Sequence, residues 1–71
     1  MDVVVSGEWI QLDQLMKREN RISSGGEIRF FLASHTVLLN GEPVREKRKK
    51  IRPGDTLTVD GEIWRIVGEK A

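Results

Sequence analysis

The apolar residues that follow position 11 have the spacing of a helix. Leu12, Leu15 and Met16 recur at i, i+3 and i+4, which places them on one helical face. Asn20 tolerates the left-handed backbone conformation that often ends a helix. We therefore predict a first helix from Leu12 to about Asn20.

A second helix is predicted to start at Ser24. Ser24 and Glu27 have the spacing of a capping box, in which each side chain satisfies a free amide of the first turn. Gly25 and Gly26 fall in that turn, although each costs about 1 kcal/mol relative to alanine in a helix. Two interpretations are evenly balanced: helix packing, or the close approach of a ligand to the backbone.

The apolar residues of the second helix fall on two faces. One face carries Ile28, Phe31 and Leu32, and the other carries Phe30 and Ala33. We therefore expect this helix to be sandwiched, with one face against the first helix and the other against a sheet.

The rest of the chain has the features of β-structure. Val3 to Val5 form a β-branched run, which indicates a brief strand or an extended lead-in. After Val37 to Leu39, the pair Asn40-Gly41 suits a two-residue hairpin turn, because both residues adopt positive φ. Pro43 restricts the returning strand to a short length or to a sheet edge.

A second hairpin is predicted near the C-terminus. Pro53, Gly54 and Asp55 mark a turn, and Asp60 with Gly61 marks the hairpin turn that follows. The apolar residues on either side of that hairpin turn are Leu57, Val59, Ile63, Trp64 and Ile66. The order of elements is therefore helix, helix, then strands.

The composition fits one domain spanning residues 1–71. Hydrophobic residues make up 38% of the chain, which is too many for a disordered tail. Cysteine is absent and His35 is the single histidine, so disulfides, thiolate metal sites and histidine clusters are excluded, and we expect no cofactor. The sequence shows neither a secretion signal nor an apolar run of the roughly 20 residues that cross a bilayer, which predicts a cytoplasmic protein without membrane contact.

The net charge of +1 conceals a concentrated basic segment. Between Arg45 and Arg52, six basic residues accompany one acid, Glu46, which gives +5 there and leaves −4 for the rest of the chain. An RNA backbone presents closely spaced phosphates, and each Lys or Arg contact releases condensed counterions. The segment is therefore the main candidate for binding, and the alternative is a solvated loop.

Four motifs follow one another between Leu12 and Asp55: LDQLMKREN, SSGGEIRFFL, VLLNGEPV and KKIRPGD. In this order they resemble the helix, turn, helix, Asn-Gly hairpin and Pro-Gly-Asp turn of the RNA-binding domain named after the fourth protein of the small ribosomal subunit, the S-four domain. The chain length and the paired glycines resemble its stand-alone bacterial YaaA-like members. The motifs cover residues 12–55, and the C-terminal hairpin covers residues 56–67.

The resemblance implies an α+β fold, in which an αα hairpin packs on a small, mostly antiparallel sheet. It also implies RNA binding without catalysis, by the helix pair and the adjoining basic loop. The candidate RNA-binding residues are Lys17, Arg18, Arg21, Ser24, Gly25, Arg29, Lys47, Arg48, Lys49, Lys50 and Arg52. Any one of the helix-pair bases is about as well explained by an ion pair with a nearby acid.

The basic segment differs from the pattern of these relatives. They tend to place Arg-Arg-Gly-Lys/Arg-Lys before the Pro-Gly-Asp turn, where this chain has residues 46–50, EKRKK. Glu46 therefore replaces a base and Arg48 replaces a glycine.

The four aromatic residues, Trp9, Phe30, Phe31 and Trp64, are candidates for stacking on RNA bases, but packing in the core is the favoured interpretation for all of them. His35 is interpreted as a helix-end residue without chemistry. No nucleophile with a base, metal cluster or carboxylate pair indicates an enzyme.

The leading hypothesis is a module that binds structured RNA, such as ribosomal or transfer RNA, through shape and phosphate contacts, with the ribosome or a protein as a further partner. The alternative is a protein-interaction module whose basic loop meets an acidic partner in replication, repair or ribosome assembly. Binding to DNA is a third option.

Overall fold

The computed structural model describes residues 1–69 of the chain. Its helical elements are α1 (Leu12–Arg18), the single 3₁₀ turn η1 (Gly25–Glu27) and α2 (Ile28–Ser34). Its strands are β1 (Asp2–Val5), β2 (Ile10–Gln11), β3 (Val37–Leu39), β4 (Glu42–Pro43), β5 (Lys50–Ile51), β6 (Thr56–Val59) and β7 (Glu62–Gly68).

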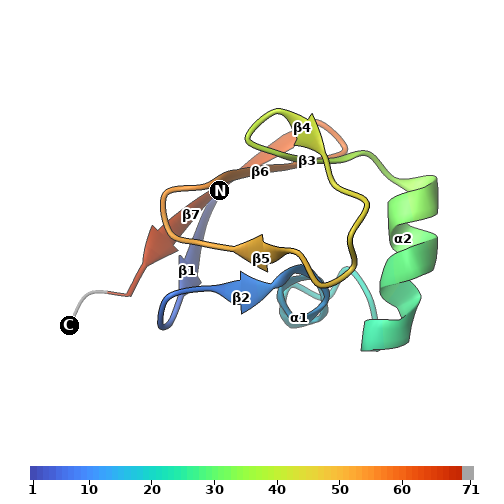
Figure 1. The fold of residues 1–71 in the computed structure, drawn as a ribbon, viewed down its shortest axis with the longest axis horizontal. Coiled ribbons are helices and arrows are strands. Elements are labelled where there is room, and N and C mark those ends of the chain that lie inside the picture. Colours follow the sequence, from blue (N-terminus) through green and yellow to red (C-terminus); the bar gives the residue numbers. More distant parts are fainter. Residues whose placement is uncertain (70–71) are drawn as a thin grey trace.

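Five strands form the main sheet, in the order β1-β7-β6-β3-β4. Only β1 and β7 pair in parallel, and every other pair of neighbours is antiparallel. Strands β2 and β5 form a separate two-stranded sheet beside α1 (Figure 1). The predicted α+β fold with a mostly antiparallel sheet is confirmed.

One face of the main sheet carries the core. Side chains alternate along β1, β6 and β7, so that Val3, Leu57, Trp64 and Ile66 are buried while their neighbours face solvent. The predicted apolar face of α1 is confirmed, because Leu12, Leu15 and Met16 are completely buried. The remaining core residues are Val5, Ile22, Ile28, Phe31, Val37, Val44, Ile51 and Val59.

The turns agree with the sequence predictions. Asn40 and Gly41 both have positive φ, 51° and 85°, as do Asp60 and Gly61 at 49° and 86°. Asn20 has φ 61° just beyond α1, so the left-handed end of the first helix is also confirmed. Strand β4 ends at Pro43 and lies at the sheet edge, as expected.

The Asn-Gly hairpin and the Pro-Gly-Asp turn are bonded to each other. The Asn40 side-chain amide donates to Asp55 Oδ1 at 3.1 Å, and Asn40 Oδ1 accepts the Thr56 amide at 2.9 Å. Asp55 Oδ2 in turn accepts the Arg52 amide at 2.9 Å. Two motifs that lie 15 residues apart therefore form one structural unit.

The start of the second helix differs from the prediction. The chain first makes the 3₁₀ turn η1, and α2 begins only at Ile28. The Ser24 side chain caps no amide, whereas Glu27 reaches back one residue further and accepts the Ser23 amide at 3.2 Å. The predicted capping box is therefore wrong as a reciprocal pair, because the tighter 3₁₀ turn changes which amide faces Glu27.

The prediction that α2 is sandwiched is also wrong. Ile28 and Phe31 enter the core, but Phe30 on the opposite face is 76% exposed. Within residues 1–69 no layer covers that face, because the sheet and α1 lie on the same side of α2 (Figure 1). Trp9 is likewise not a core residue, since 38% of it is exposed.

Candidate nucleic-acid interface

Residues 45–49, called the basic loop below, run between two buried anchors. Val44 precedes the loop, is buried in the core, and donates its amide to the Val37 carbonyl at 3.0 Å. Ile51 follows the loop, is fully buried, and pairs with Ile10 of β2. The pairing of β2 with β5 was not predicted from the sequence. Through this pairing, Lys50 of the basic segment belongs to a strand.

The backbone of the basic loop is bonded to the first turn of α1. The Leu12 amide donates to the Lys49 carbonyl at 2.8 Å, and the Asp13 amide donates to the Lys47 carbonyl at 3.2 Å. The Lys49 amide also closes a turn onto the Glu46 carbonyl at 3.2 Å. Amides of a helical first turn have no partner inside the helix, so the loop carbonyls satisfy them while the basic side chains remain free to point outward.

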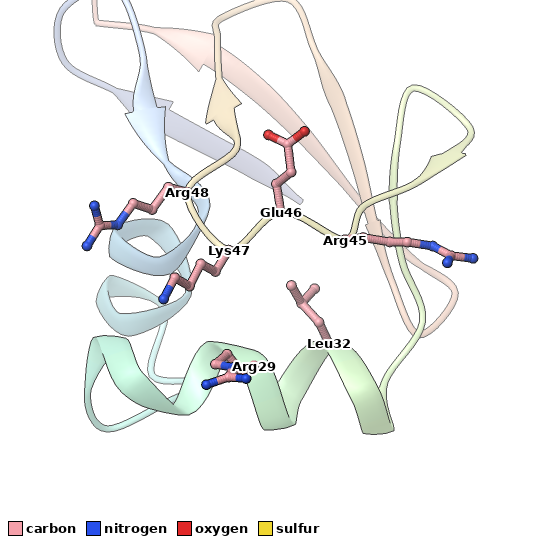
Figure 2. A pocket seen from close by; sticks show the side chains of 6 residues that line it. All are labelled: Arg29, Leu32, Arg45, Glu46, Lys47 and Arg48. Atoms are coloured by element: carbon pink, nitrogen blue, oxygen red, sulfur yellow. The ribbon is translucent and has the colours of Figure 1, made fainter.

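The basic loop and α2 together line one pocket. Its lining residues are Arg29, Leu32, Arg45, Glu46, Lys47 and Arg48. Figure 2 shows Lys47 pointing from the loop toward α2, where Arg29 lies, while Glu46 points away from α2. The pocket thus lies between Arg29 of α2 and three bases of the loop, which follow Arg29 by 16 or more positions in the chain.

None of these four bases belongs to an ion pair within residues 1–69. The ion pairs in that part of the chain use Arg18, Arg21, His35 and Arg65. The charges of Arg29, Arg45, Lys47 and Arg48 are therefore not neutralised by a neighbouring carboxylate, and an anionic ligand is the partner that such a cluster suits.

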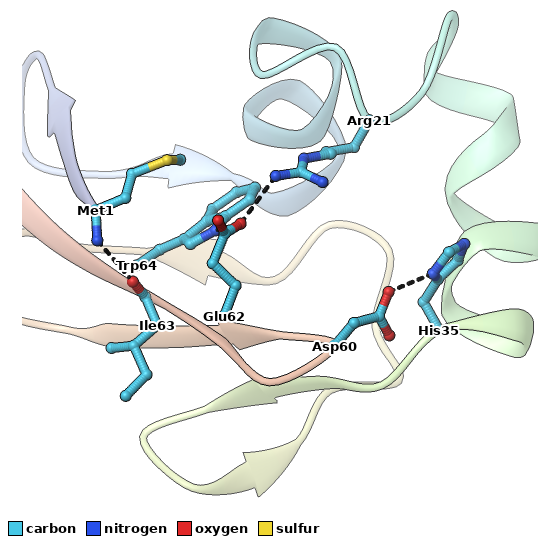
Figure 3. Close-up of polar contacts among 7 residues, drawn as sticks. All are labelled: Met1, Arg21, His35, Asp60, Glu62, Ile63 and Trp64. Carbon is cyan, nitrogen blue, oxygen red and sulfur yellow. Dashed lines mark hydrogen bonds and ion pairs between the residues drawn. The ribbon is translucent and has the colours of Figure 1, made fainter.

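Arg21 instead contacts side chains of the main sheet. Its guanidinium lies 2.9 Å from Glu62 Oε1 and 5.2 Å from the centre of the Trp64 ring (Figure 3). The same Glu62 oxygen accepts the Trp64 indole N–H at 2.7 Å. Arg18 lies 3.4 Å from Glu19 Oε2. For Arg18 and Arg21, the ion-pair alternative is what the structure shows.

The other predicted residues flank the pocket or lie beyond it. Lys49 lines a second pocket with Arg45 and Glu46, and Lys50 lies with its Nζ 4.8 Å above the Trp9 ring. Arg52 follows β5 and is exposed. The structure brings neither Lys17 nor Ser24 into the pocket, although both are exposed.

The paired glycines have no complete explanation inside the molecule. A Cβ on Gly25 would lie 3.6 Å from Asp13 Oδ2, which is ordinary contact, and a Cβ on Gly26 would meet nothing within 4 Å. Neither glycine has positive φ. Packing therefore does not require glycine at position 26.

Arg45 was not among the predicted site residues, although it opens the basic segment. Only the pocket geometry reveals its place opposite α2. Arg48, which stands where the resembling relatives tend to have glycine, does not have positive φ, so this loop does not need a glycine there.

The far end of α2 is tied to the sheet by His35 and Asp60 (Figure 3). His35 Nδ1 lies 2.5 Å from Asp60 Oδ2, and the other carboxylate oxygen accepts the Thr36 amide at 2.8 Å. These hydrogen bonds, with that from His35 the larger effect, lower the pKa of Asp60 below its ordinary value of 3.8. The contact fixes the helix that carries Arg29.

A comparison with known families identifies the class of protein. A family model described as S4 domain matches residues 3–67. The chain therefore belongs to the S4 domain family, and the predicted resemblance to the S-four domain is confirmed. This membership supports an RNA-binding role.

A curated relative is more specific. The chain is 36% identical over 59 residues to a protein of Bacillus subtilis (strain 168) named probable ribosome maturation protein RlbA, and the match covers 83% of each protein. No helix among residues 1–69 is long and apolar enough to span a membrane. In the same part of the chain, no group of His, Asp and Glu side chains is arranged to hold a metal ion.

Proposed function

We propose that this protein binds structured RNA through phosphate contacts, without catalysing a reaction, in the cytoplasm. Family membership supports RNA as the ligand. The name of the Bacillus subtilis relative supports ribosomal RNA, with a role in ribosome maturation, ahead of transfer RNA. A ribosomal protein near the binding site is then a natural further partner.

The observation that carries this proposal is the pocket between α2 and the basic loop. Arg29, Arg45, Lys47 and Arg48 line it, and none of them has an ion-pair partner within residues 1–69. Phosphates along an RNA strand are repeated negative charges, so basic side chains gathered from two elements suit such a strand without reading the sequence.

We assign the main phosphate contacts to these four residues. The flanking contacts in the proposal are Lys17, Ser24, Gly25, Lys49, Lys50 and Arg52. Arg18 and Arg21 are left out, because their carboxylate partners already neutralise them. In this arrangement α2 docks on the RNA and the basic loop clamps the backbone.

The test compares two variants with the same change in charge. Arg29→Glu reverses one base of the pocket, and Arg65→Glu reverses an exposed base on β7, which faces away from the core. Losing a charged contact costs about 1.5–3 kcal/mol, so Arg29→Glu should weaken binding to an RNA hairpin at least tenfold. Arg65→Glu should change it much less.

The same titration with a DNA hairpin of identical sequence separates RNA from DNA, because only RNA offers the 2′-hydroxyl. If both variants keep the wild-type affinity and circular dichroism, the pocket is not the binding surface. If the wild-type protein binds no RNA at low salt but retains a protein partner after RNase treatment, the protein-interaction alternative is correct.

A further inference from the structure

Phe30 is the most exposed large apolar side chain in the described chain. It lies on the outer face of α2, next to Arg29, and 76% of it is accessible to solvent. The other helical aromatic, Phe31, is buried in the core. Nothing in the packing of the fold accounts for a phenyl ring at position 30.

Of the four aromatic side chains, Phe30 is also the only one whose ring has no stacking or cation–π contact within residues 1–69. Each of the other three rings has one such contact: Phe31 stacks on His35, Trp64 lies under Arg21, and Trp9 lies under Lys50. Because 76% of Phe30 is accessible to solvent and its ring has no such contact in that part of the chain, the ring is open to a flat ligand from outside the molecule.

The residues next to Phe30 on the same helical face leave it uncovered. Positions one turn away, at i−4 and i+3, are its neighbours on a helix surface. At i+3 stands Ala33, which has only a methyl group. Gly26, at i−4, belongs to the 3₁₀ turn η1 before α2, and a Cβ there would meet nothing within 4 Å. Neither residue has a side chain long enough to cover the ring.

The two larger neighbours are turned back onto the backbone. Ser34 donates its hydroxyl to the Phe30 carbonyl at 2.8 Å. The Glu27 carboxylate accepts the Ser23 amide at 3.2 Å, in the turn before α2. Neither side chain is placed to cover the phenyl ring.

We propose that Phe30 is a stacking platform for an unpaired RNA base. This inference rests on the proposed function and makes its substrate more specific: an RNA in which one nucleotide has left the stack beside a duplex. Arg29 precedes Phe30 in α2, so a phosphate held at the pocket brings the base of the same strand within reach of the ring. Stacking on aromatic side chains is available to every base, because each has a π-face.

The arrangement also accounts for Gly26. A Cβ there would meet no atom within 4 Å, so the space above Gly26 is open to a ligand and is not filled by the fold. The glycine is thus explained by a ligand that approaches closely from outside, which is the interpretation that the internal packing leaves open.

The test uses three synthetic RNA hairpins with one stem sequence. The first is fully paired, the second has one unpaired adenosine in the stem, and the third has an abasic residue at that position. Stacking on one base is worth about five- to hundredfold in affinity, so the wild-type protein should bind the adenosine RNA more tightly than the abasic RNA by that factor. Phe30→Ala should abolish the difference, and Phe30→Trp should keep it.

Two further variants separate stacking from other effects. Gly26→Leu should cover the ring and reduce binding to the adenosine RNA without lowering the melting temperature, since its φ is not positive and its site is open. Ile63→Ala, at a 56% exposed apolar residue of β7, is the matched control and should change nothing.

The outcomes distinguish this inference from the proposed function. If the wild-type protein binds all three RNAs equally, or if Phe30→Ala weakens binding to the adenosine and abasic RNAs by the same factor, stacking is refuted while RNA binding stands. If the wild-type protein binds none of them at low salt, the proposed function fails and this inference fails with it.

Discussion

Replacing Lys47 and Arg48 together by alanine should remove about half of the salt dependence that the four pocket bases contribute to RNA binding. The pocket presents four bases, and each one that neutralises a phosphate contributes about 0.7–0.9 to the slope of log affinity against log salt. The wild-type slope from the pocket should therefore be roughly −2.8 to −3.6. Removing two contacts should reduce its magnitude by roughly 1.4–1.8.

The assay is a fluorescence anisotropy titration of one labelled RNA hairpin at four or more salt concentrations. The double variant should remain folded, because exposed substitutions usually change the free energy of unfolding by less than about 0.5 kcal/mol. The control is Arg18→Ala with Arg65→Ala, which removes the same charge from two side chains that already lie near carboxylates. Its slope should stay close to that of the wild type.

A double variant that binds with the wild-type slope would refute the role of the basic loop as a phosphate clamp. An equal loss of slope in the control would show instead that net charge, and not the position of the bases, governs binding. Both results are readable from the same set of titrations.

Two predictions concern the fold. Gly41→Val forces a β-branched residue to adopt φ 85°, which costs about 1–3 kcal/mol, so thermal denaturation should show a melting temperature lower by several degrees; unchanged stability with lost RNA binding would assign this turn to the ligand instead. Asp60→Asn keeps the size of the side chain but replaces the carboxylate, whose pKa is lowered by the hydrogen bonds from His35 and the Thr36 amide, with a neutral amide. Because the folded pKa lies below the ordinary 3.8, the charged carboxylate stabilises the fold above about pH 4, and this contribution is lost as the pH falls below that value. Melting temperatures measured from pH 5 downward should fall less steeply in the variant, and parallel curves would contradict the assignment.

Local chemistry made the turns predictable from the sequence. Asn40 with Gly41, and Asp60 with Gly61, are residues that adopt positive φ, so their turns do not depend on the rest of the fold. The buried face of α1 was predictable for a similar reason, since the spacing of Leu12 and its neighbours is itself the helical period.

The errors arose where distant segments decide the outcome. Periodicity groups Phe30 and Ala33 on one face of α2, but it does not say whether anything packs against that face. The two-residue strands β2 and β5 are too short to show a pattern, and their residues pair across 39 and 41 positions of the chain. Likewise, the approach of Lys47 to Arg29 follows from the docking of the basic loop on α1, which no local motif encodes.

The sequence predicted only part of the candidate site, for the same reason. Charge density identified the basic segment, but it treated Arg18 and Arg21 as equivalent to Arg29. The contacts in the structure separate them. Glu19, the next residue in the chain, reaches Arg18, and Glu62 of β7 reaches Arg21, whereas no carboxylate within residues 1–69 pairs with Arg29.

The bonds from α1 to the basic loop have a consequence for how the loop evolves. The backbone path of the loop is fixed by hydrogen bonds from α1 to the carbonyls of Lys47 and Lys49, and every amino acid has a backbone carbonyl. Side chains along the loop are therefore exchangeable without redirecting the chain, so related proteins are free to vary the order of charges and keep one backbone path. A loop already held in place also loses little conformational entropy when a ligand arrives, so that more of each new contact is retained as affinity. Glu46 and Arg48 stand where the resembling relatives tend to have a base and a glycine, so the charge of this loop can differ while the backbone bonds to α1 stay the same.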